Sequence, residues 1–215
     1  MKTKNYIKFI ELLLLTTLPP SIIIIYELQR YVIPIIIILC IFAIIYLKKF
    51  NYKFSPFLNF NRAIFYKILI RNLFIGILMG CITYIFFSSQ FMFLPVLNFK
   101  SWLLIIIFYP ILSALPQEII YRSFFFNRYF HLFNSKKNVI LFNAIVFSLA
   151  HSIYLNYFII ILTFIAGIIF AKNYYCNRSI FLVTLDHSIL GSIIFSLGLG
   201  HFFYKSNVEY IYSIL

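Results

Sequence analysis

Long apolar runs with few charges dominate this chain and restrict the folds open to it. Hydrophobic residues make up 63% of the 215 residues and charged residues only 11%, whereas a water-soluble domain carries about 25% charged residues. A water-soluble fold cannot hide this much apolar surface, so lipid must be the solvent for most of the chain. The sequence therefore predicts an all-α fold, a polytopic transmembrane helical bundle surrounded by membrane lipids.

The apolar runs give about seven expected spans, because crossing the hydrocarbon core takes about 20 residues. The predicted spans are 9–26, 31–47, 68–87, 101–126, 138–155, 157–171 and 179–199. The basic start and the first apolar run look like a signal peptide, but no A-x-A cleavage pattern follows and a second apolar run begins almost at once. We therefore expect the first run to be a retained span.

Lysine and arginine residues fall mainly on one predicted side of the membrane. With the N-terminus inside, only Arg30, Lys100 and Lys205 of the 18 basic residues lie outside, and the other 15 lie on or toward the cytoplasmic side. Cytoplasmic loops collect Lys and Arg, so this split predicts the orientation and a basic cytoplasmic loop at 48–67. The net charge of +13 then reflects topology and anionic lipid. Nucleic acid is not an expected partner, because there is no soluble basic module.

A few ionisable residues stand inside spans that are otherwise mainly apolar. They are Glu118, His151, Asp186 and His187. Each such group costs about 2.5–3.5 kcal/mol at a helix centre. Arg122 follows Glu118 by four residues, so the two share a helix face and can pair, and Gln117 stands beside them. With a rise of about 1.5 Å per residue, Glu118, His151 and His187 lie at similar depth, about 12–20 Å from the cytoplasmic boundary. This agreement predicts one site that opens toward the cytoplasm.

The same residues resemble the three motifs of the CPBP family, the CAAX-type or Abi-type intramembrane endopeptidases. The family patterns are E-E-x-x-x-R, F-x-x-x-H and H-x-x-x-N. Here Gln117-Glu118-x-x-x-Arg122, Phe147-x-x-x-His151 and then His187 agree in order, spacing and placement on three helices. The resemblance implies a catalytic core at 101–200, preceded at 1–100 by N-terminal transmembrane helices with the basic loop, all within one integrated membrane domain.

The family's chemistry implies an intramembrane endopeptidase that cleaves a membrane-associated protein or peptide. A carboxylate and a histidine would activate water while other polar groups stabilise the oxyanion, and Arg122 would hold Glu118 in place and ionised. Glu118, His151 and His187 would suit zinc with one open position, and they suit a metal-free mechanism equally well. The substrates implied are prenylated C-terminal peptides, bacteriocin leader peptides (bacteriocin processing) or membrane-protein segments. We expect a multi-pass protein of a bacterial cytoplasmic membrane.

Two positions depart from the family pattern and leave alternatives open. Gln117 stands where the first Glu is expected, and an amide cannot accept a proton, so the role of base would pass to Glu118. Gly191 stands where the pattern has Asn, and Asp186 beside His187 would supply a supporting carboxylate. A non-catalytic relative acting as an immunity or scaffold protein is one alternative. A membrane protein that binds haem through His151 and His187 is another.

Overall fold

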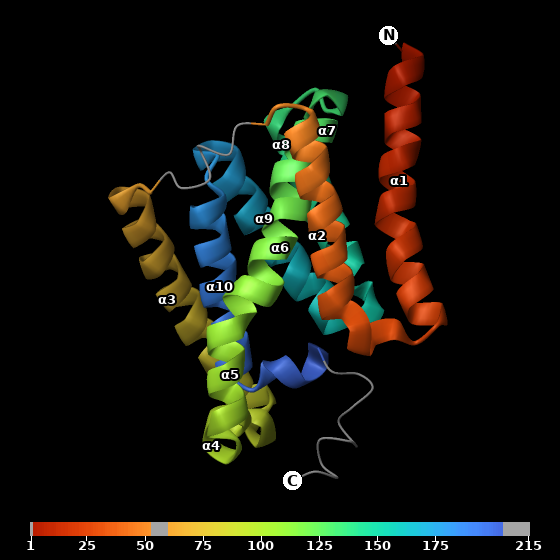
Figure 1. The fold of residues 1–215 in the computed structure, drawn as a ribbon. Coiled ribbons are helices and arrows are strands. Elements are labelled where there is room, and N and C mark those ends of the chain that lie inside the picture. Colours follow the sequence, from red (N-terminus) through yellow and green to blue (C-terminus); the bar gives the residue numbers. More distant parts are fainter. Residues whose placement is uncertain (1, 53–59, 204–215) are drawn as a thin grey trace. The chain divides into compact units, whose positions relative to one another are not determined.

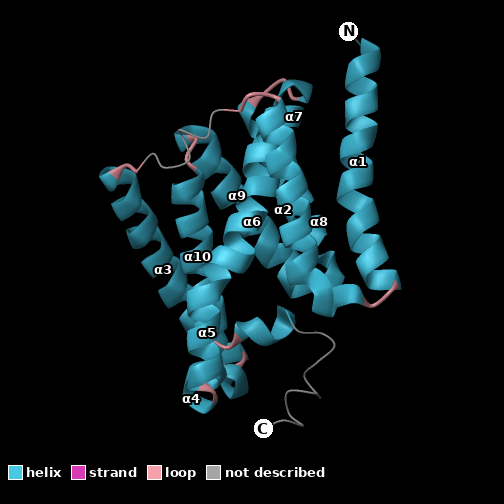
Figure 2. Ribbon diagram, in the orientation of Figure 1, coloured by secondary structure: helices cyan, strands magenta, loops and turns pink. Residues whose placement is uncertain are grey.

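The computed structural model describes residues 2–52 and 60–203, and every regular element in these ranges is a helix (Figures 1 and 2). The α-helices are α1 (Lys2–Ile25), α2 (Val32–Lys49), α3 (Arg62–Phe86), α4 (Phe93–Leu97), α5 (Phe99–Tyr109), α6 (Leu115–Glu118), α7 (Phe125–Tyr129), α8 (Lys136–Ala150), α9 (Tyr157–Asn177) and α10 (Ile180–Ser196). The predicted all-α fold is confirmed. Part of the predicted basic loop, residues 53–59, and Lys205 lie outside the described residues.

The helix lengths confirm a polytopic membrane protein. Within the described ranges, six helical segments are long and apolar enough to cross a membrane: Asn5–Ile25, Leu28–Lys49, Arg62–Phe86, Phe99–Leu132, Lys136–Tyr154 and Tyr157–Asn177. The run predicted at 157–171 continues to Asn177, which gives it 21 residues. The last predicted span, 179–199, forms the shorter apolar helix α10, of 17 residues.

Asparagine and serine residues determine where several of the helices begin. The side chains of Asn61, Asn98, Ser135, Asn156 and Ser179 each accept a hydrogen bond from a backbone N–H in the first turn of the helix that follows. The first N–H groups of a helix have no partner within it, and such caps satisfy one or two of them. Each of these residues interrupts the apolar sequence, so the helix starts are encoded locally.

The described helices belong to two compact units, and every contact reported below lies within one of them. Unit 1 comprises Met1–Lys53 and Pro116–Arg178, and unit 2 comprises Phe54–Leu115 and Ser179–Leu215. Each unit takes helices from both the N-terminal and the C-terminal half of the chain. The single integrated domain expected from the sequence stays a prediction.

Inside unit 1, α8 and α9 approach each other closely because small residues face one another. A Cβ added at Gly167 would lie 3.0 Å from the Cα of Ala144, so any larger residue there would crowd α8. The hydroxyl of Ser148 donates a hydrogen bond to the carbonyl of Ile160 at 2.7 Å and joins the same two helices. Close packing of small residues is a common way for helices to associate in lipid.

The predicted orientation can be tested with single cysteines in a variant that lacks Cys40, Cys81 and Cys176. Asn51 and Ser135 are exposed residues next to helix ends of unit 1 that are predicted to be cytoplasmic. Cysteines at these two positions should resist a membrane-impermeant thiol reagent in intact cells, and should react once the membranes are opened.

A cysteine at Tyr157 provides the matched control, because this side chain is 90% exposed and is predicted to face the outside. It should react in intact cells. Reaction at Asn51 and Ser135, with protection at Tyr157, would reverse the orientation.

Candidate functional site

Glu118 and Arg122 form a fully buried ion pair in unit 1. The Nε atom of Arg122 lies 2.9 Å from Oε2 of Glu118, and both side chains are 0% exposed. The two residues are one helical turn apart, and they pair as the sequence predicted. Gln117 is also buried. The unit therefore encloses a carboxylate, a guanidinium and an amide within six consecutive residues.

The helical segment that carries these residues is irregular on both sides of them. Helix α6 lies between two π-helical stretches, Pro110–Ala114 and Ile119–Phe124. Proline has no N–H to donate. Pro110 begins the first π-helical stretch, and Pro116 follows that stretch within α6. Short π-helical turns occur frequently at functional sites. Gln117 and Glu118 thus lie in a short α-helical segment between two distorted stretches, and Arg122 lies in the second of them.

Arg122 also contacts α8, through Asn143. The Nη1 atom of Arg122 donates a hydrogen bond to Oδ1 of Asn143, and Nδ2 of Asn143 donates to the carbonyl of Tyr121 at 2.7 Å. The guanidinium carbon lies 5.0 Å from the ring centre of Phe147 and 6.0 Å from that of Phe170, within the range of a cation–π interaction. The buried cation is therefore surrounded by a carboxylate, an amide and two aromatic rings.

Sequence reasoning missed Asn143, although a signal for it was available. Asn143, Phe147 and His151 are spaced four residues apart, which places them on one face of a helix. Asn143 is a fully buried amide in a run that is otherwise largely apolar. Glu118 was singled out as an ionisable group inside a predicted span. The same criterion applied to amides would have singled out Asn143.

His151 ends α8 and begins the short 3-10 helix His151–Tyr154. Its Nδ1 lies 2.8 Å from the carbonyl oxygen of Phe147. A carbonyl only accepts hydrogen bonds, so Nδ1 carries a proton. In the neutral imidazole Nε2 then has the lone pair, which can accept a proton or bind a metal.

Phe147 links His151 to the ion pair. Its ring centre is 4.7 Å from that of His151 and 5.0 Å from the guanidinium carbon of Arg122. Glu118, Arg122 and His151 are therefore parts of one continuous group of side chains in unit 1.

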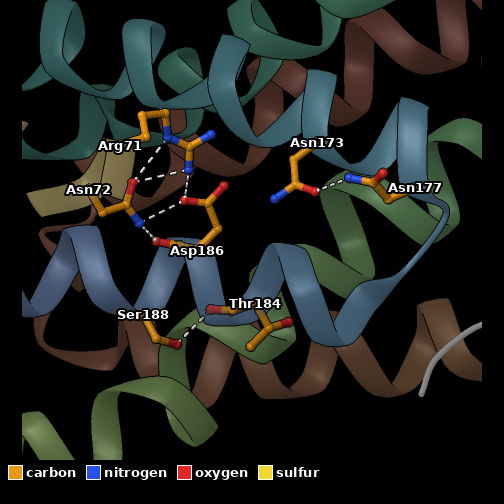
Figure 3. Close-up of polar contacts among 7 residues, drawn as sticks. All are labelled: Arg71, Asn72, Asn173, Asn177, Thr184, Asp186 and Ser188. Atoms are coloured by element: carbon orange, nitrogen blue, oxygen red, sulfur yellow. Dashed lines mark hydrogen bonds and ion pairs between the residues drawn. The ribbon is translucent and has the colours of Figure 1, made fainter. Parts of the chain in front are cut away.

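In unit 2, the carboxylate of Asp186 on α10 is held by α3 (Figure 3). Asp186 is 0% exposed and forms an ion pair with Arg71. Nδ2 of Asn72 donates to Oδ1 of Asp186 at 3.0 Å, and Arg71 donates to Oδ1 of Asn72 at 3.0 and 3.1 Å. The expected role of Asp186 in orienting His187 stays a prediction.

The contribution of α3 to this group was missed as well. Arg71 was counted only among the charges of the cytoplasmic side, and Asn72 was not singled out. A cation followed by an amide within the predicted span 68–87 is unusual in lipid, where polar residues face the protein interior and pair with one another. The neighbouring pair Arg71–Asn72 was therefore the available signal.

His187 precedes Gly191 by one turn of α10, and both positions lie next to Tyr109, the last residue of α5. His187 is 5% exposed. Its ring meets that of Tyr109 edge to face, with 5.9 Å between ring centres. Gly191 is the position at which the third motif departs from its pattern, and Tyr109 packs directly against it.

The predicted site residues are thus divided between the units. Unit 1 brings together Glu118, Arg122 and His151, while Asp186 and His187 belong to unit 2. Within neither unit do three or more described His, Cys, Asp or Glu side chains form a group that could hold a metal. The set predicted for zinc draws on both units, so its convergence stays a prediction.

Comparison with known proteins gives one family. Residues 99–193 match the family described as type II CAAX prenyl endopeptidase, Rce1-like. The chain matches neither a curated protein nor a solved structure. The matched segment contains all of the motif positions, namely Gln117, Glu118, Arg122, Phe147, His151, His187 and Gly191. Arg71 and Asn72 lie outside it.

Proposed function

Residues 99–193 form a domain of the type II CAAX prenyl endopeptidase family. We propose, on this basis, that the chain is an intramembrane endopeptidase that cleaves a membrane-associated protein or peptide. The observation that carries the proposal is the buried group of unit 1. It contains a carboxylate paired with Arg122 and a histidine whose Nδ1 bonds to the Phe147 carbonyl. The Arg122 guanidinium and the His151 ring both lie against the ring of Phe147.

We assign the role of general base to Glu118. The carboxylate accepts a proton from water, and the hydroxide formed attacks the carbonyl carbon of the peptide bond. The same proton then passes to the amine nitrogen as the C–N bond breaks, so that water and peptide give a carboxylic acid and an amine. Arg122 holds the carboxylate in one orientation, and Asn143 holds Arg122. His151 and His187 act on the water or on the leaving group through their ring nitrogens.

Zinc is the cofactor that the donor set of Glu118, His151 and His187 would fit, since carboxylate oxygen and imidazole nitrogen are among its usual ligands. A zinc-bound histidine usually donates its other ring N–H to an oxygen acceptor, and His151 donates its Nδ1–H to the Phe147 carbonyl. Bound zinc would make a water molecule more acidic. Zinc analysis of the purified protein, with cleavage measured before and after chelation, distinguishes this form from the metal-free mechanism, which would keep its activity.

The substrate is sought by comparing cells with and without the protein. An uncleaved peptide or protein should accumulate in cells that lack it, and the purified protein should cleave that molecule in vitro. The family description names prenyl substrates, so an internally quenched peptide ending in a farnesylated C-a-a-X sequence is tested beside unmodified apolar peptides. Failure of the purified protein to cleave any of these would contradict the proposed function.

Restoring the family pattern with Gln117→Glu should leave the cleavage rate unchanged or raise it. Gln117 is buried directly before Glu118, so the variant adds a second proton acceptor beside the first. Gln117→Ala should lower the rate less than Glu118→Gln does, because the amide of Gln117 only helps to position the reacting groups and does not accept the proton. The measurement is the initial rate of cleavage with each purified variant.

The same experiment decides between the enzyme and its alternatives. If the wild type is inactive and only Gln117→Glu cleaves, the chain is a non-catalytic relative, with a role in immunity or as a scaffold. A reduced-minus-oxidised absorption spectrum with haem bands would instead favour His151 and His187 as haem ligands.

A further inference from the structure

The packing of Tyr109 against α10 offers an explanation for the missing asparagine of the third motif. Tyr109 is the last residue of α5, and Pro110 follows it as the first residue of a π-helical stretch. Its ring meets the rings of His187 and Phe195 edge to face, at centre-to-centre distances of 5.9 and 5.4 Å. The ring is thus fixed between two side chains of α10.

Gly191 is the third contact of this ring, and it leaves the space that the ring fills. A Cβ at position 191 would overlap Cε1, Cζ and the hydroxyl oxygen of Tyr109. The backbone does not require a glycine there, because Gly198 is the glycine of the described residues that has a positive φ. The requirement for glycine at 191 therefore comes from the phenol end of Tyr109.

The Tyr109 hydroxyl consequently occupies the place that an asparagine side chain at 191 would take. Position 191 is one helical turn from His187, a rise of about 5.4 Å along the axis. Tyrosine hydroxyls and asparagine amides both donate hydrogen bonds to the oxyanion in acyl-transfer sites.

We propose that Tyr109 and Gly191 together replace the asparagine of the pattern, with the Tyr109 hydroxyl as the oxyanion donor beside His187. The inference rests on the proposed function and adds a catalytic residue to it. The departure from the pattern at position 191 is then an exchange of one oxyanion donor for another. The donor is the hydroxyl of Tyr109 on α5 instead of an asparagine on α10. The two positions are therefore coupled, and neither can change alone without loss.

The decisive variant is Tyr109→Phe, which keeps the ring and its packing and removes the hydroxyl. Its kcat should fall by about 10²–10³-fold, as when other oxyanion donors are removed, and its KM should change little. The assay uses the internally quenched peptides, with and without the farnesyl group. Tyr84→Phe is the matched control in the same unit, because Tyr84 is 66% exposed, and its kcat should stay at the wild-type value.

Ser192→Ala tests the other hydroxyl next to position 191. Residue 192 lies about 100° round the helix from 191, so this variant should also keep the wild-type kcat. Wild-type activity in Tyr109→Phe, or a loss in Ser192→Ala instead, would overturn the assignment and leave the proposed function standing. A wild type that cleaves no peptide would overturn the proposed function and the assignment with it.

An exchange of both residues tests the coupling without relying on the Tyr109→Phe variant. Gly191→Asn alone should lower the thermal stability of the purified protein in detergent, because the new side chain meets the Tyr109 ring. The double variant Tyr109→Ala/Gly191→Asn should be more stable than Gly191→Asn. It should also cleave faster than Tyr109→Ala, since the asparagine amide now supplies the hydrogen-bond donor. A double variant no better than either single variant would contradict the exchange.

Discussion

The Glu118→Gln variant is expected to cleave peptide about 10²–10⁴ times more slowly than the wild type, the usual result of removing a general base. Glutamine has nearly the same shape as glutamate, so it can stay within hydrogen-bonding distance of Arg122, but its amide cannot accept a proton from water. The measurement is kcat on the peptide cleaved best by the wild type, at matched amounts of folded protein judged by gel filtration.

Two further variants separate a chemical effect from a structural one. Glu118→Asp keeps the carboxylate at a shorter reach and should retain more activity than Glu118→Gln. Glu27→Gln changes an exposed carboxylate between α1 and α2 and should keep the wild-type rate. If Glu118→Gln cleaved as fast as the wild type, the base would be another residue, and the role assigned to Glu118 would be wrong.

The Arg122→Met variant is expected to lower the free energy of unfolding by about 3–5 kcal/mol, because it leaves the buried Glu118 carboxylate without its cation. Arg122 and Glu118 are both 0% exposed, so bulk solvent does not screen the charge that is left unpaired. Asn143 loses its hydrogen bond from Arg122 in the same variant. The measurement is reversible unfolding of the purified protein in mixed detergent micelles.

The matched control is Arg62→Met in α3, because Arg62 is exposed and surface substitutions usually change stability by no more than about 0.5 kcal/mol. The double variant Glu118→Leu/Arg122→Met removes both charges and should recover much of the loss, since an apolar pair often replaces a buried ion pair without penalty. Equal stability of Arg122→Met and the wild type would show that the pair does not stabilise the fold.

Several features of this protein follow from the sequence alone, because their causes are local. The apolar runs predicted the all-α membrane fold and the approximate positions of the helices. The spacing of Glu118 and Arg122 predicted their ion pair, since residues four apart on a helix are neighbours. Phe147 and His151 were selected only through the resemblance to the family motif, and the structure adds the bond from the His151 ring to the Phe147 carbonyl.

Other features were decided only by the tertiary structure, because they depend on which helix faces which. Asn143 contacts Arg122 across two helices, Arg71 and Asn72 hold Asp186, and Tyr109 fills the space left by Gly191. No spacing rule connects residues that lie between 21 and 115 positions apart. Such pairings arise because lipid cannot satisfy a buried polar group, so each one takes whatever partner helix packing brings to it.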